Sequence, residues 1–180
     1  WWLKNPHLQT FWPVLFRRQE PLEYRAERLE LADGDFVDLC WTGPATGPLV
    51  IVLHGLQGSV SSPYVIGLMR ALMASGTRGV LMHFRGCSGE PNRMARGYHS
   101  GDTGDLGALI DMIRTREPDT PLAAAGYSLG GNVLLKYLGE AGEQAPLHAA
   151  VAVSVPLVLQ AASDRLRQGL SRIYDRYLLR

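Results

Sequence analysis

The chain has 180 residues, a formal net charge of +1, 46% hydrophobic residues and 19% charged residues. This length and composition predict one globular core with at most part of a second domain. The near-neutral charge excludes a nucleic-acid-binding footprint, and the sequence lacks the run of ~20 apolar residues that spans a bilayer.

The N-terminal segment, residues 1–18, is rich in aromatic residues and is interrupted by Pro6 and Pro13. It lacks the basic-then-apolar order of a secretory signal. A Trp-rich amphipathic segment is able to touch a membrane surface, but we interpret it as packed along the domain and do not expect a peripheral membrane contact. The chain begins at Trp1 rather than Met, so we expect that a segment lies upstream of it.

Short apolar segments alternate with helical patterns along the rest of the chain. Two segments around Asp33-Gly34-Asp35 predict a hairpin. Buried strands are predicted at 49–53, 79–84, 122–127 and 149–155, with helices at 64–75, 102–116 and 130–138. This alternation predicts an α/β fold with a doubly wound, mostly parallel sheet that is truncated after the strand following the third helix. Residues 1–156 are expected to form the N-terminal part of this domain, and residues 157–180 the truncated start of a helical cap or insertion, helical over 164–179.

One motif carries the chemistry. Gly126-Tyr127-Ser128-Leu129-Gly130 follows an apolar strand and leads into a helix, which is the setting of a G-x-S-x-G nucleophile elbow. The glycines allow close approach of neighbouring backbone, and the helix N-terminus favours negative charge. We predict that Ser128 is a catalytic nucleophile; the alternative is a serine that only caps the helix.

A serine nucleophile needs donors for the oxyanion that develops on the acyl group. The backbone N–H of Leu129, next after the nucleophile, is predicted to be one donor. The N–H of Leu56, in the loop after the first central strand, is predicted to be the other. His54 begins this loop and is expected to orient it rather than to act as the base.

The order of a triad in this fold is Ser, then an acid, then His, and only His148 follows Ser128. His148 precedes a strand, so we expect it at the sheet edge opposite the nucleophile. His99 is interpreted as ordering the start of a helix, and Asp164 as a surface residue. The acid and base are therefore expected beyond Arg180, and the 180 residues alone are predicted to be nearly inactive.

Two cysteines, Cys40 and Cys87, form neither a disulfide framework nor a metal-ligand cluster. Their number is compatible with a cytoplasmic location, which we predict. Cys87 lies in a Gly-rich turn after a strand and is a rival nucleophile. No candidate base is adjacent to it in sequence, which favours Ser128.

The chain resembles the YheT-like branch of the α/β-hydrolase superfamily. The resemblance rests on segments that together span most of the chain: residues 5–10, His54-Gly55-Leu56 with Gly58, residues 84–89, residues 98–103, and residues 126–132. It implies a serine carboxylesterase acting on small or medium-chain acyl esters, or on lipid substrates, with no metal or organic cofactor. Ser128 matches the family's charge-relay serine. The open alternative is a degenerate α/β-hydrolase used as a binding module, since a fold does not fix a function.

Overall fold

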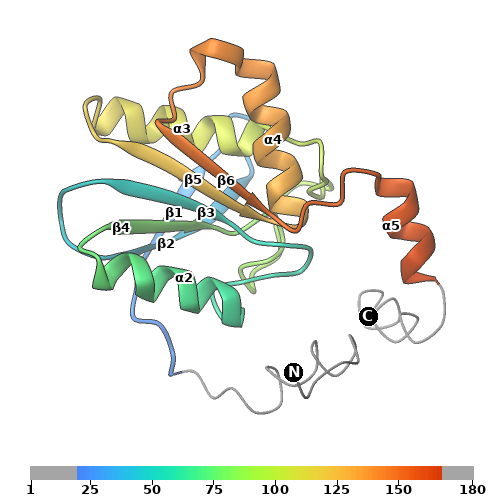
Figure 1. The fold of residues 1–180 in the computed structure, drawn as a ribbon, viewed down its shortest axis with the longest axis horizontal. Helices are drawn as coiled ribbons and strands as arrows, with labels where there is room; N and C mark the ends of the chain where they lie inside the picture. Colours follow the sequence, from blue (N-terminus) through green and yellow to red (C-terminus); the bar gives the residue numbers. More distant parts are fainter. Residues whose placement is uncertain (1–19, 168–180) are drawn as a thin grey trace, which may run out of the picture.

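A computed structural model describes residues 20–167, apart from the side chain of Leu166, and shows one six-stranded sheet flanked by helices (Figure 1). The strands are β1 (Arg25–Glu30), β2 (Phe36–Thr42), β3 (Leu49–Leu53), β4 (Arg78–Met82), β5 (Leu122–Tyr127) and β6 (Ala149–Val153). The helices are α2 (Pro63–Ala74), α3 (Gly104–Arg116), α4 (Leu129–Ala141), α5 (Leu159–Leu166) and a 3-10 turn, η1 (Gly142–Gln144).

The sheet order is β1-β2-β4-β3-β5-β6, with β3, β4, β5 and β6 parallel and the β1–β2 hairpin antiparallel at one edge. The predicted doubly wound, mostly parallel sheet is confirmed. Leu53 pairs with both Met82 and Gly126, so the carboxyl ends of the three central strands are level. Their following loops meet at one edge, where ligands bind in open α/β sheets.

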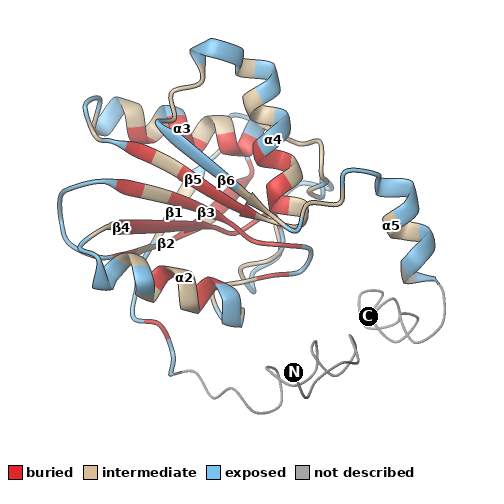
Figure 2. Cartoon of the chain, viewed as in Figure 1, coloured by how far each residue is buried: buried red, intermediate tan, exposed pale blue. Residues whose placement is uncertain are grey.

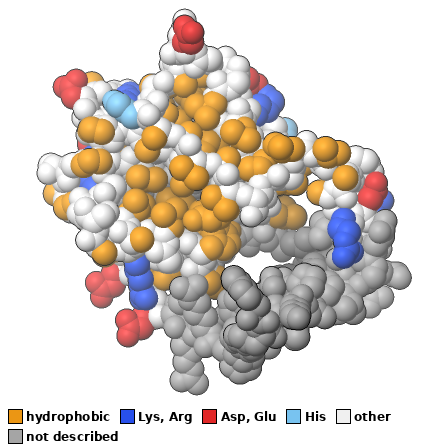
Figure 3. All heavy atoms as spheres, in the orientation of Figure 1, with side chains coloured by type: hydrophobic (Ala, Val, Ile, Leu, Met, Phe, Trp, Pro, Cys, Tyr) orange, Lys and Arg blue, Asp and Glu red, His pale blue; other side chains and the backbone are white. Residues whose placement is uncertain are grey.

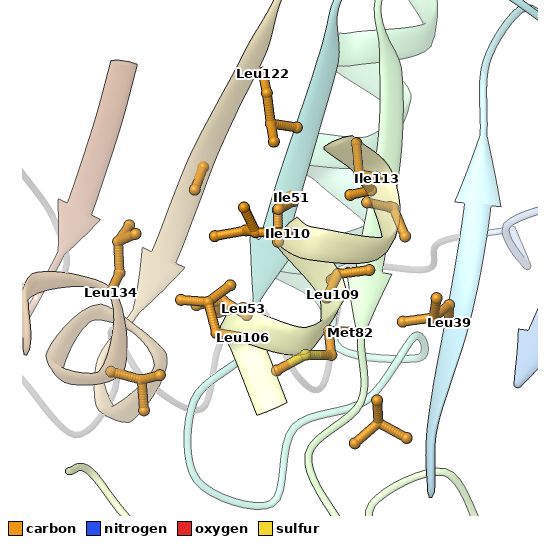
Figure 4. Packing of buried hydrophobic residues seen from close by; sticks show 14 of the residues in the cluster. Leu39, Ile51, Leu53, Met82, Leu106, Leu109, Ile110, Ile113, Leu122 and Leu134 are labelled. Carbon is orange, nitrogen blue, oxygen red and sulfur yellow. The ribbon is translucent and has the colours of Figure 1, made fainter. Parts of the chain in front are cut away.

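The central strands are buried on both faces because helices cover each side of the sheet (Figure 2). The larger apolar cluster lies between the sheet and α3 and α4, and Figure 4 shows side chains of α3 facing those of the central strands. A smaller cluster lies between the other face and α2. This packing explains why the central strands appear in the sequence as continuous aliphatic runs.

Several predicted boundaries shift by a few residues. The third predicted helix begins at Leu129 and continues to Ala141, where Gly142 ends it with a φ of 56°. The last described helix begins at Leu159, five residues before its predicted start, because Pro156 is the only strong helix breaker in that segment. The remainder of the predicted 164–179 helix, the aromatic N-terminal segment and residues 5–10 lie outside the described residues.

β6 differs from the other parallel strands because it is the outermost strand at its side of the described sheet and is largely exposed. Val151 is 57% exposed, and Leu157 in the following segment is 78% exposed. Figure 3 shows hydrophobic side chains gathered over the middle of the molecule, where Figure 1 places β5 and β6. This side of the described sheet therefore presents an exposed apolar edge.

Candidate active site

Ser128 lies in the turn between β5 and α4, with φ of 51° and ψ of −115°. A positive φ at a residue with a side chain is strained and persists only where the surroundings enforce it. The Ser128 N–H donates to the Val153 carbonyl at 2.8 Å, and the Ser128 carbonyl accepts from the Asn132 N–H at 3.1 Å. The turn is therefore held from both sides, by the end of β6 and by the first turn of α4.

The glycines around this turn are required by close backbone contacts. A Cβ atom on Gly126 would lie 2.5 Å from the Gly130 carbonyl oxygen. A Cβ on Gly130 would lie 2.5 Å from the His54 carbonyl oxygen, and one on Gly131 would lie 2.6 Å from a Val155 methyl group. Because atoms do not approach this closely, each position accepts only glycine without movement of the neighbouring backbone or side chain.

The loop after β3 borders Ser128 directly. A Cβ atom placed on Gly55 would lie 3.4 Å from the Ser128 Cβ. Within residues 20–167, the backbone N–H groups of Leu56 and Leu129 donate to no other protein group. Leu56 is 48% exposed, and Leu129 begins α4, where first-turn N–H groups have no partner within the helix. Two free donors therefore accompany the serine.

His54 links the loop after β3, in which it lies, to the loop after β4. Its Nε2 accepts from the Phe84 N–H at 3.1 Å, so Nδ1 carries the proton and donates to the Gly55 carbonyl at 2.6 Å. The side chain is fully buried, and burial lowers the pKa of His54 to about 4. With both nitrogens engaged in a neutral ring, His54 orients the two loops, as expected from the sequence.

His83 performs the reciprocal task, which the sequence analysis missed. It follows β4 as His54 follows β3, and its Nε2 accepts from the Val60 N–H at 3.1 Å in the loop after β3. Its Nδ1 lies 3.3 Å from the Asp38 carbonyl, to which it donates, and burial lowers its pKa. We call His54 and His83 the crossed histidines. The shared signal was a histidine directly after each buried strand.

The other histidines of the described chain lie away from a base position. His148 accepts from the Leu122 N–H at 3.2 Å, at the amino end of β5, and so lies at the predicted opposite edge of the sheet. His99 is exposed and its Nδ1 accepts from the Gly101 N–H at 3.1 Å, within the turn before α3. Asp164 is exposed on α5 and accepts from Gln160 at 2.9 Å.

Arg85 lies in the loop after β4 and is the centre of a buried ion cluster. It is 4% exposed and binds Asp105 of α3 through two hydrogen bonds of 2.8 and 2.7 Å. It also contacts Asp33 at 2.8 Å and Asp35 at 3.0 Å in the β1–β2 turn. Burial acts to raise the pKa of Asp35, but hydrogen bonds, first from Asn92, lower it to about 2. From the sequence, Asp33 and Asp35 were predicted only in a hairpin turn and Asp105 only in a helix, and no ion cluster was predicted.

Neither cysteine is activated as a nucleophile. Cys87 is half-buried, and burial raises its thiol pKa, while burial raises that of Cys40 to about 12. A thiol reacts as its thiolate, so both environments reduce reactivity at neutral pH. Both cysteines are free.

Among the described residues, no group of three or more His, Cys, Asp or Glu side chains is arranged to hold a metal ion. The same part of the chain contains no helix with the length and apolar character needed to cross a bilayer.

Comparison with known proteins relates residues 48–180 to a family model described as the alpha/beta hydrolase fold. The chain is 51% identical to YheT of Escherichia coli (strain K12), over 97% of this chain and 53% of that protein. It is 31% identical to phospholipase ABHD3 of Homo sapiens, over 99% of this chain and 46% of that protein. The chain thus spans about half the length of both relatives. The structure of esterase Pf2001 from Pyrococcus furiosus has the same fold, with a TM-score of 0.70 and 20% identity over 89% of this chain and 64% of that one.

Proposed function

Because this chain belongs to the α/β-hydrolase fold family, we propose that it is the nucleophile-bearing part of a serine carboxylic ester hydrolase. In this proposal Ser128 forms an acyl-enzyme with small or medium-chain acyl esters. The observation that carries the proposal is the strained backbone of Ser128, with φ of 51°, in a turn between a buried strand and a helix N-terminus. The nucleophile elbow of this fold has that geometry for presenting a serine Oγ above the sheet.

The reaction follows from the groups around the turn. Ser128 Oγ attacks the acyl carbon, the bond from that carbon to the ester oxygen breaks, and the alcohol leaves with a proton. Water then attacks the acyl-enzyme, which releases the carboxylic acid and regenerates the serine. The N–H groups of Leu56 and Leu129 stabilise the oxyanion in both steps.

Proton transfer in this proposal requires an Asp–His pair beyond Arg180 in the full-length protein. Each described histidine is engaged elsewhere: His54 and His83 hold loops, His99 holds a turn, and His148 lies at the opposite edge of the sheet. We accordingly propose that residues 1–180 alone turn over ester substrates very slowly.

The substrate class is supported by the names of the relatives. One relative is named a phospholipase and one solved structure is named an esterase, and these names belong to ABHD3 and to Pf2001. For this chain we propose an acyl ester or lipid as the substrate, no cofactor and no nucleic-acid partner. We propose a cytoplasmic location, which the two free cysteines support.

The test is labelling of the folded full-length protein by a fluorophosphonate probe, together with hydrolysis of a short-chain p-nitrophenyl ester. Ser128→Ala is expected to abolish labelling and to lower kcat about a millionfold, the loss typical of removing a serine nucleophile. Ser75→Ala, at the end of α2, is the matched control and should leave both unchanged. A folded full-length protein that neither labels nor turns over ester would instead favour the non-catalytic binding module.

A further inference from the structure

Two tyrosine hydroxyl groups hold the backbone on either side of Leu56. The Gly55 N–H donates to the Tyr64 hydroxyl at 2.9 Å, and the Gln57 N–H donates to the Tyr98 hydroxyl at 2.8 Å. The Leu56 N–H between them donates to no group of the described chain. The tyrosines therefore occupy the two neighbouring donors and leave the middle one available.

The loop that they hold is tightly built. The Gly58 N–H donates to the Gly55 carbonyl at 3.0 Å, and Gln57 has a φ of 52°, as the third position of a turn with positive φ requires. A Cβ atom on Gly58 would lie 2.6 Å from the Tyr64 hydroxyl and 2.8 Å from the His54 Cβ. Only glycine therefore lets the loop close against this hydroxyl. Without external partners a strained turn of this kind relaxes.

Each tyrosine is itself fixed by a ring contact. The Tyr98 ring stacks on Phe84, with centroids 5.0 Å apart and planes 7° apart, and Phe84 is the residue whose N–H binds His54. The Tyr64 ring packs against Tyr127, adjacent to Ser128, at 4.7 Å. Burial raises the pKa of Tyr98 to about 12, so its hydroxyl stays protonated at neutral pH. Both acceptors are thus held in place from the loop after β4 and from the turn that carries the serine.

We propose that Tyr64 and Tyr98 are positioning residues that hold the N–H of Leu56 in the geometry needed to bind the oxyanion. This inference rests on the proposed function, because it assigns a task within the same site. An oxyanion donor must be aimed at the place where charge develops, and a loop that moves by a fraction of an ångström loses much of that stabilisation. The two hydroxyls limit that movement from opposite sides of the donor.

The experiment compares Tyr64→Phe, Tyr98→Phe and the double variant in the full-length protein. Phenylalanine keeps the rings that pack on Tyr127 and Phe84 but removes the acceptors. Because complete loss of one oxyanion donor lowers kcat by about 100- to 1000-fold, we expect ~10-fold from each single variant and ~100-fold from the double variant. KM for p-nitrophenyl butyrate should stay within about twofold, since the substrate carbonyl gains most of its charge only in the transition state.

A second readout separates positioning from general weakening. Butylboronic acid adds to a serine as a charged tetrahedral adduct, so its inhibition constant should rise by the same factor by which kcat falls. The matched control is Tyr137→Phe, on α4 about 12 Å along the helix from Leu129, where a half-buried ring loses the same hydroxyl group. Its kcat, inhibition and melting temperature should equal those of the wild type.

Tyr64 is partly exposed, so Tyr64→Phe tests the idea even where Tyr98→Phe lowers the melting temperature. An active wild type whose Phe variants keep kcat and boronate inhibition within twofold would overturn the inference alone. A rise in KM with unchanged kcat would also overturn it, because it indicates a role in substrate binding. A wild type that neither labels with fluorophosphonate nor turns over would overturn the proposed function and this inference with it.

Discussion

The centre of the sheet and its β6 edge are stabilised in different ways. At the centre, the strands are buried on both faces, and the loops after β3 and β4 are anchored by the crossed histidines and by Arg85. At the edge, β6 and the segment leading to α5 expose Val151 and Leu157. The centre contains its own partners within the chain, whereas the edge presents apolar surface that nothing in the described residues covers.

The two regions are therefore expected to differ in how much a substitution changes the free energy of unfolding. At the centre His54, His83 and Arg85 each bond to a partner on another segment of the chain, so the loss of one partner leaves an unpaired buried group. Substitution of the exposed apolar residues at the edge should change the free energy of unfolding little, because these side chains are already in contact with water. Four measurements test this difference.

The largest effect is expected for Arg85→Met. Removing the guanidinium leaves Asp35 and Asp105, both buried, without their cation, and breaking a buried pair from one side costs about 3–5 kcal/mol. The free energy of unfolding from urea titration measures the loss. Arg93→Met removes the exposed pair with Glu30 and is the control, with a much smaller expected change because solvent screens this pair. Equal losses of unfolding free energy in the two variants would show that the buried cluster stabilises the fold no more than an exposed ion pair does.

Acid should weaken the centre through the crossed histidines. The folded pKa of His54 is about 4 and the unfolded value about 6.5, so the unfolded chain binds the proton more readily in this window. The stabilisation is complete above pH ~6.5, is lost as pH falls towards ~4, and amounts to about 3 kcal/mol in total. Urea titrations from pH 7 to 5, above the range where most carboxylates titrate, should detect about 2 kcal/mol of this loss. A free energy of unfolding that stays constant over this range would contradict the neutral, buried assignment of His54.

Two glycines of one helix should respond in opposite ways to alanine. Gly130→Ala places a methyl group 2.5 Å from the His54 carbonyl oxygen and should cost about 2 kcal/mol by overpacking. Gly139→Ala, near the other end of α4, meets no atom within 4 Å and should stabilise the protein by about 0.5–1 kcal/mol. Thermal melts followed by circular dichroism at 222 nm provide the comparison. Stabilisation by both alanines would show that the backbone around Gly130 moves to accept a methyl group without loss of stability.

The smallest effect on stability is expected at the edge. Val151→Lys adds a charge to an exposed residue of β6 and should change the free energy of unfolding by less than ~0.5 kcal/mol. It should nevertheless raise the soluble yield of residues 1–180, since a charge on an exposed edge strand blocks edge-to-edge pairing. Met73→Lys, on the exposed end of α2, is the control. An equal gain in yield from the control would assign the effect to net charge rather than to β6.

The strands and the serine turn were predictable because their physical causes are local. Continuous aliphatic runs such as 49–53 occur where both faces of a strand are covered, and Gly126 and Gly130 mark a turn that only glycine permits. β1 was located only in part, because Arg25 to Glu30 alternate charged residues with few apolar ones on a largely exposed strand.

The anchoring of the loops could not be predicted, because it depends on distances between segments. His54 and Phe84 are 30 positions apart, and Arg85 and Asp35 are 50 apart, yet each pair is in contact. A histidine or an arginine in a Gly-rich turn has the same appearance in sequence whether it is exposed or buried among partners. The register of β3 with β4 determines which loops meet, and the sequence does not specify that register by itself.

The bond from the Ser128 N–H to the Val153 carbonyl links the serine turn to β6, at the end of the ladder that joins β5 to β6. The backbone of the proposed nucleophile is thereby tied to the last residue of the exposed strand. Opening of β6 releases this amide hydrogen to solvent, while the amides of the buried central strands remain protected. The exchange of one deuteron at Ser128 consequently reports how well the outer strand is ordered, and any partner that covers β6 slows that exchange without touching the serine side chain.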